Sequence, residues 1–191
     1  MNFPNFLSFL RIIIALIAPF YLINDNLWVR LITGAVCTIA IATDWFDGWY
    51  ARKFNQVTNL GKILDPIADK MLVLISFSVF VYLDVVSIWW VIPIFIREIF
   101  VTIYRFIFLS KNIVVAAAKS GKIKTVMQMI TLGIAYVFFI TYNHFDKQYF
   151  SKYYQAILWF ALGLTLYFTV KSGILFFKNN WKIIKSYHNI A

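Results

Sequence analysis

Long apolar runs separated by short polar connectors dominate the 191-residue chain. A bilayer core about 30 Å thick needs about 20 mostly apolar residues per helix. Six runs approach that length, and they predict membrane-spanning helices over residues 6–23, 27–49, 65–83, 88–109, 125–142 and 154–177. Because no internal repeat or long polar linker separates these runs, the sequence predicts a single all-α integral membrane domain over residues 1–191.

Basic residues collect in alternate connectors, and this asymmetry predicts the orientation of the helices. Lys and Arg in short loops concentrate on the cytoplasmic side of a membrane. The regions after the second, fourth and sixth runs hold most of them: Arg52, Lys53, Lys62, Lys111, Lys119, Lys122, Lys124, Lys178, Lys182 and Lys185. The opposite connectors hold few, so both termini are predicted to be cytoplasmic.

The two ends of the chain carry weaker signals. The first run includes Arg11 and lacks the order of a cleavable signal peptide, so we expect it to stay in the protein. The tail beyond residue 177 mixes Trp181, Ile183 and Ile184 with lysines, which is typical of an interfacial amphipathic segment. A solvated basic anchor explains the tail equally well.

Composition supports the membrane interpretation and narrows the partners. With 62% hydrophobic and 14% charged residues, the chain has too few polar side chains to cover a soluble globule. Its formal net charge is +10, but the basic residues lie between and within apolar runs. We therefore expect lipid headgroups and phosphorylated substrates as anionic partners, and no nucleic acid. The single cysteine, Cys37, excludes an intramolecular disulfide.

Four of the eight acidic residues lie between positions 44 and 69: Asp44, Asp47, Asp65 and Asp69. The strongly apolar parts of the second and third runs, residues 31–43 and 71–83, are too short to cross the hydrocarbon core at 1.5 Å per residue. Both helices must therefore continue through their aspartates. This places the two carboxylate pairs at the cytoplasmic ends of two adjacent antiparallel helices.

The spacing of the aspartates predicts a metal site. Asp44 and Asp47 are three apart and Asp65 and Asp69 are four apart, and either spacing brings side chains to one helix face. Four facing carboxylates repel one another unless cations stand between them. Carboxylates without histidine or cysteine partners favour Mg²⁺ or Mn²⁺, and two such ions are what phosphoryl transfer uses. The two histidines, His144 and His188, fall in a predicted outer loop and in the tail, and we assign them no role.

Three residues between the aspartate pairs also indicate a binding site for a phosphorylated ligand. Gly48 and Gly61 would allow a ligand to approach the backbone closely, and Arg52 would supply a positive charge for a diphosphate. A loop glycine and a cytoplasmic anchor are the ordinary alternatives for Gly61 and Arg52.

The stretch from Asp44 to Asp69 resembles the signature of the CDP-alcohol phosphotransferases, D-x2-D-G-x2-A-R-x8-G-x3-D-x3-D. Every specified position is filled: Asp44, Asp47, Gly48, Ala51, Arg52, Gly61, Asp65 and Asp69. The resemblance implies six transmembrane helices, a homodimer, and an active site that faces the cytoplasm at a bacterial cell membrane.

The resemblance also implies roles for individual residues. Four aspartates would hold two divalent ions, Mg²⁺ or Mn²⁺: Asp44, Asp47, Asp65 and Asp69. Asp69 would also take the proton from an acceptor hydroxyl, which attacks the β-phosphate of a CDP-linked lipid and displaces CMP. A further set would line the CDP-diacylglycerol site: Asn5, Ser8, Gly48, Arg52, Thr58 and Gly61.

A group of basic residues predicts what kind of acceptor the protein uses. It lies near the cytoplasmic side of the fourth and fifth runs and comprises Arg97, Arg105, Lys119, Lys122 and Lys124. Arginine within a membrane helix needs a polar cavity or a partner, and several cations together suit a phosphorylated acceptor. These stretches are also similar to the corresponding region of bacterial phosphatidylglycerophosphate synthases, which implies sn-glycerol 3-phosphate as the acceptor. Glu98 is expected to be an ion-pair partner, and any single lysine could be only an anchor.

Three other functions remain open from the sequence. A sister enzyme could use another acceptor, as cardiolipin synthases and serine or inositol phosphate transferases do. Intramembrane carboxylates also mark cation channels and transporters, although such paths place polar groups near the membrane centre and not at one surface. An inactive scaffold is disfavoured because all four aspartates are present.

Overall fold

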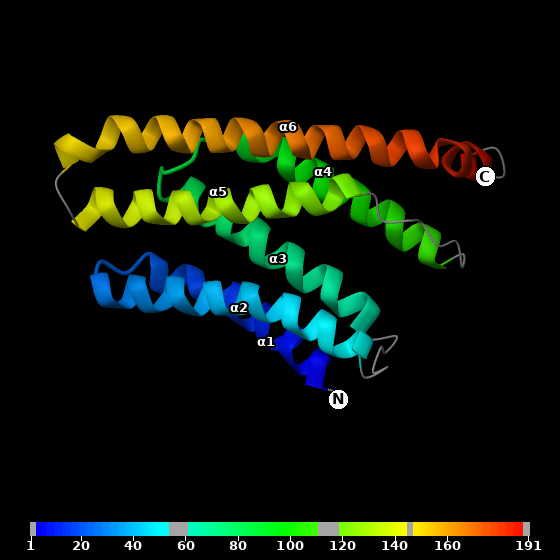
Figure 1. Cartoon of the computed structure of the whole chain (residues 1–191), viewed down its shortest axis with the longest axis horizontal. Coiled ribbons are helices and arrows are strands. Elements are labelled where there is room, and N and C mark those ends of the chain that lie inside the picture. The colour runs from blue at the N-terminus through cyan, green and yellow to red at the C-terminus, as the bar shows by residue number, and fades with distance from the viewer. Residues whose placement is uncertain (1–2, 54–60, 111–118, 145–146, 189–191) are drawn as a thin grey trace. The chain divides into compact units, whose positions relative to one another are not determined.

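The computed structural model of the chain describes residues 3–53, 61–110, 119–144 and 147–188 (Figure 1). Within these ranges the chain forms helices and no strands, as the sequence predicts. The six helices are α1 (Phe3–Leu22), α2 (Leu27–Lys53), α3 (Gly61–Tyr82), α4 (Ile88–Ser110), α5 (Lys119–His144) and α6 (Lys147–His188).

Two short connectors show how polar residues reverse the chain. Asn26 caps α2, because its side-chain oxygen accepts hydrogen bonds from the amides of Trp28 at 2.9 Å and Val29 at 3.4 Å. After α3, Asp84 adopts a positive φ of 55°. The amides of Val85 and Val86 turn back to the carbonyl of Phe80, which satisfies an acceptor that the helix end leaves open.

The chain packs as two compact units. The first unit comprises Met1–Val86 and Tyr136–Phe150, and the second comprises Ser87–Ala135 and Ser151–Ala191. In the first unit α1 packs against both α2 and α3. Figure 1 shows the start of α1, the end of α2 and the start of α3 at one end of this unit. The same end therefore carries the opening segment and both aspartate pairs.

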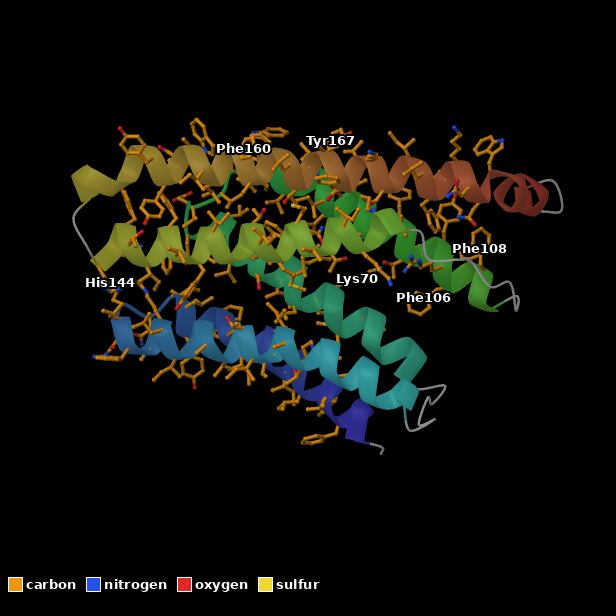
Figure 2. All side chains as sticks on the ribbon, viewed as in Figure 1. Lys70, Phe106, Phe108, His144, Phe160 and Tyr167 are labelled. Atoms are coloured by element: carbon orange, nitrogen blue, oxygen red, sulfur yellow. The ribbon has the colours of Figure 1, made fainter. Side chains whose placement is uncertain are left out.

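Arg30 organises another part of the first unit. Its buried side chain donates to the carbonyl of Leu22 at 3.2 Å and to Asp25 at 3.0 Å, and its guanidinium lies 4.6 Å from the ring centroid of Phe139. His144, labelled in Figure 2, places its Nε2 2.9 Å from Arg30 Nη1. The sequence predicts His144 in an outer loop, but it ends α5 and helps to join α5 to α2.

The second unit holds α4, residues 119–135 of α5, and most of α6. Thr131 of α5 and Thr165 of α6 share a buried hydrogen bond of 2.7 Å. The rings of Tyr104 on α4 and Phe177 on α6 meet edge to face with centroids 5.5 Å apart. Polar and aromatic contacts therefore tie α6 to both other helices of this unit.

Buried polar and exposed apolar side chains indicate a membrane environment. Tyr153 is 80% exposed, whereas Glu98 is 2% exposed. Such an arrangement suits lipid outside and polar contacts inside. Two helical stretches among the described residues, Gly121–His144 and Tyr153–Trp181, are by themselves long and apolar enough to cross a membrane.

The composition of α4 is less decisive, because charged residues interrupt its apolar run. α4 carries Arg97, Glu98 and Arg105. α6 has 42 residues, and at 1.5 Å per residue its length is roughly 63 Å, about twice the hydrocarbon core. The tail beyond residue 177, expected to be an interfacial amphipathic segment or a solvated basic anchor, continues α6 as far as His188.

Candidate active site

Both aspartate pairs lie on continuous helices. α2 runs through Asp44 and Asp47 to Lys53, and α3 begins before Asp65 and Asp69. The prediction that each helix continues through its aspartates is therefore confirmed. Within a helix, residues three or four apart share a face. The two carboxylate pairs thus occupy the end of α2 and the start of α3, which lie at the same end of the first unit (Figure 1).

The other signature residues frame these pairs. Gly48 and Arg52 lie in the last two turns of α2, and Gly61 is the first residue of α3. Gly61, predicted as a turn or contact glycine, thus stands where the chain enters the helix that carries Asp65. Thr58 falls outside the described residues.

The start of α1 contributes a buried polar side chain. Asn5 and Ser8 occupy its first two turns, and Ser8 is buried. One turn further on, buried Arg11 donates through Nε to the carbonyl of Ala40 at 3.2 Å. Ala40 lies one turn before Asp44 on α2. This contact holds the opening helix against the part of α2 that leads into the aspartates.

The chemistry of the donor set fits hard divalent cations. Four carboxylates on the adjoining ends of two helices of one unit offer oxygen ligands only. Oxygen donors suit Mg²⁺ and Mn²⁺ better than zinc. The residue types therefore match the cofactors that the sequence predicts.

Two of the predicted acceptor-binding residues converge on Glu98 in the second unit. Arg97 Nη1 donates to Glu98 Oε1 at 3.1 Å, and Lys124 Nζ of α5 donates to the same oxygen. Gln128 Nε2, one turn after Lys124, lies 3.4 Å from it. Glu98 is therefore the ion-pair partner that the sequence predicts, and it serves two cations at once.

Of the other predicted acceptor-binding residues, Arg105 lies close enough to interact electrostatically with Arg97, Glu98 and Lys124. Arg105 is exposed on α4, with its guanidinium carbon 6.0 Å from the ring centroid of Phe176 on α6. Lys122 is exposed on α5, and Lys119 is the first residue of that helix. The second unit thus brings Arg97 and Lys124 together, and leaves Arg105 and Lys122 on its surface.

Sequence reasoning missed Gln128 and the Arg30–His144 pair. Gln128 carries no charge, and only its place one turn from Lys124 on a helix could have indicated its role. Arg30 and His144 are 114 residues apart, so no local spacing could have joined them. Their contact stabilises the fold. Neither residue belongs to the signature between Asp44 and Asp69.

Comparison with known proteins identifies the family. The model of the CDP-alcohol phosphatidyltransferase family matches residues 1–167, which run across both units. The chain belongs to this family. The resemblance seen in the sequence is thereby confirmed, and the all-α membrane architecture agrees with it.

Individual relatives carry a more specific name. A Bacillus subtilis protein is 36% identical over 97% of this chain and 98% of its own length. An Escherichia coli K12 protein is 36% identical over 69% of this chain and 75% of its own length, and one from Salmonella choleraesuis is 37% identical over the same shares. All three are named "CDP-diacylglycerol--glycerol-3-phosphate 3-phosphatidyltransferase". That name matches the reaction predicted from the sequence.

Proposed function

We propose that this chain transfers the phosphatidyl group of CDP-diacylglycerol to sn-glycerol 3-phosphate, giving phosphatidylglycerophosphate and CMP. The observation that carries the proposal is the complete family signature on α2 and α3, with its four aspartates on the adjoining ends of these two helices. The name of the full-length Bacillus subtilis relative supports the choice of donor and acceptor.

The aspartates would have two roles, metal binding and proton acceptance. Four of them would hold two divalent ions: Asp44, Asp47, Asp65 and Asp69. These ions, when bound, neutralise charge on the diphosphate as it reacts. Asp69 would accept the proton of the glycerol 3-phosphate hydroxyl. The hydroxyl oxygen forms a bond to the β-phosphorus, the bond from that phosphorus to the bridging oxygen breaks, and CMP leaves with the electron pair.

Other residues would bind the two substrates. The CDP group would contact Asn5, Ser8, Gly48, Arg52, Thr58 and Gly61. The phosphate of the acceptor would be bound by basic residues of α4 and α5: Arg97, Arg105, Lys119, Lys122 and Lys124. Cationic side chains distinguish a phosphorylated acceptor from serine, which would need less positive charge.

The membrane arrangement is also part of the proposal. Six spans with both termini in the cytoplasm would place the aspartates at the cytoplasmic surface of a bacterial inner membrane, and two copies would form a homodimer. The alternation of basic connectors supports this topology.

The acceptor preference can be tested by CMP release. The purified protein in detergent would be given CDP-diacylglycerol, Mg²⁺ or Mn²⁺, and in turn glycerol 3-phosphate, phosphatidylglycerol, serine, inositol phosphate or no acceptor. Release that requires glycerol 3-phosphate supports the proposal. Release with a different acceptor keeps the family chemistry but overturns the acceptor.

A further inference from the structure

The Glu98 cluster of the second unit holds more positive than negative charge. One carboxylate oxygen receives the ammonium of Lys124, the guanidinium of Arg97 and the amide of Gln128. The side chains of Arg97, Lys124 and Glu98 are 13%, 7% and 3% exposed. Two cations against one carboxylate leave one positive charge in excess among these described groups. Buried charge is costly without a counter-charge, so the cluster favours an anion.

Arg97 keeps part of its hydrogen-bonding capacity unused. Its Nε is buried, and among the described residues no acceptor lies within hydrogen-bonding distance of it. A guanidinium offers five N–H donors in a planar fork that matches phosphate oxygens. Arg97 is therefore held by Glu98 through Nη1, while its buried Nε donor remains to be satisfied.

Gly173 of α6 makes room for the Arg97 side chain. Gly173 is buried, and a Cβ atom added there would lie 3.3 Å from Arg97 Cγ. Carbon atoms prefer separations of about 3.5–4.0 Å, so a larger residue would press on the stem of Arg97. The position of Arg97 thus depends on a charge contact within α4 and on a steric contact from α6.

We propose that Glu98 and Gly173 are positioning residues for the recognition of the acceptor phosphate. Glu98 holds the Arg97 guanidinium beside the Lys124 ammonium, and Gly173 leaves the space in which the Arg97 stem lies. Together they hold two cations at the same carboxylate oxygen, so that one phosphate group can meet both. This inference rests on the proposed function, in which Arg97 and Lys124 bind the acceptor phosphate.

Two substitutions perturb Arg97 by independent physical routes. Glu98→Gln keeps the size of the side chain but removes the charge that anchors both cations. We expect it to raise the KM for glycerol 3-phosphate about tenfold or more, while the KM for CDP-diacylglycerol changes less than about twofold. Gly173→Val changes no charge and should raise the same KM by a smaller factor. Glu98→Asp, which keeps the charge, should recover part of the affinity.

The control is a buried polar residue of the same unit outside the cluster. Thr131→Val removes the hydrogen bond to Thr165 that joins α5 to α6. It should lower the melting temperature without changing the KM for glycerol 3-phosphate. A purely structural role for Glu98 or Gly173 would reproduce this pattern.

The experiment is steady-state CMP release by the purified variants, with each substrate titrated at saturating concentration of the other, beside their melting temperatures. A selective rise in the KM for glycerol 3-phosphate in Glu98→Gln and Gly173→Val supports the inference. If both variants keep that KM and lose only stability, the inference is wrong. If Glu98→Gln does not fold, Gly173→Val and Glu98→Asp decide by the same criterion.

A wild type without activity on glycerol 3-phosphate overturns the proposed function, whereas an active wild type with unaltered variants overturns only the positioning role.

Discussion

Lys124 of α5 and Glu98 of α4 form a buried ion pair inside the second unit. Removing one partner of such a pair leaves the other charge poorly compensated. We predict that Lys124→Met lowers the free energy of unfolding by about 1–3 kcal/mol. Thermal unfolding in detergent measures this loss. Lys122→Met, the same change at an exposed position two residues away, should leave the melting temperature unaltered. Equal stability of the two variants would contradict the importance of the pair.

Close packing of Gly34 against Tyr136 predicts a steric effect in the first unit. A Cβ atom at Gly34 would lie 2.2 Å from Tyr136 Cζ, so the ring must move and its hydroxyl must leave the carbonyl of Arg30, now 2.9 Å away. Gly34→Ala should therefore cost about 1 kcal/mol or more in stability. The same glycine change in a Tyr136→Ala background should cost much less, because the ring is absent. Additive losses in a double-mutant cycle would show that the two positions are independent.

Metal dependence tests the role of the aspartates. We predict that EDTA abolishes CMP release and that Mg²⁺ or Mn²⁺ restores it, because oxygen ligands favour these ions. Asp47→Asn should raise the metal concentration needed for half-maximal activity about tenfold, since one negative ligand is lost. Asp25→Asn provides the matched control, because Asp25 is an exposed partner of Arg30. Activity that persists after metal removal would refute the metal site.

Topology can be tested through the single cysteine. In a Cys37→Ser background, one new cysteine at Ser87 and another at Ser186 lie beyond opposite ends of predicted spans. The distribution of basic residues predicts that a membrane-impermeant maleimide labels Ser87→Cys in intact spheroplasts and labels Ser186→Cys only in inverted vesicles. The reverse pattern would place the aspartates on the wrong side of the membrane for a cytoplasmic substrate.

The sequence predicted the helices because long apolar runs are a strong signal. The expected span at residues 88–109 matches α4, which covers Ile88–Ser110. The aspartates could be assigned to helices by length alone, since residues 31–43 and 71–83 are too short to span a membrane. The end of α6 was harder: the lysines after residue 177 indicated a change of environment, yet no proline or glycine there breaks the helix.

Contacts between distant residues could not be predicted in the same way. Glu98 was recognised as an ion-pair partner because it adjoins Arg97, but its bond to Lys124 spans 26 residues and depends on how α4 packs against α5. The contact between Gly173 and Arg97 depends on the packing of α6. Spacing predicts which residues share one helix face, whereas tertiary packing decides which faces meet.

The most direct test of the proposed reaction follows the acceptor into the product. The purified protein would be incubated in detergent with CDP-diacylglycerol, Mg²⁺ and labelled sn-glycerol 3-phosphate, beside an Asp69→Asn variant of equal melting temperature. We predict that label enters a chloroform-soluble lipid in a one-to-one ratio with released CMP, and that Asp69→Asn lowers the rate by a factor of about 10²–10⁴. CMP release without incorporation of label, or full activity of Asp69→Asn, would contradict the proposed transfer.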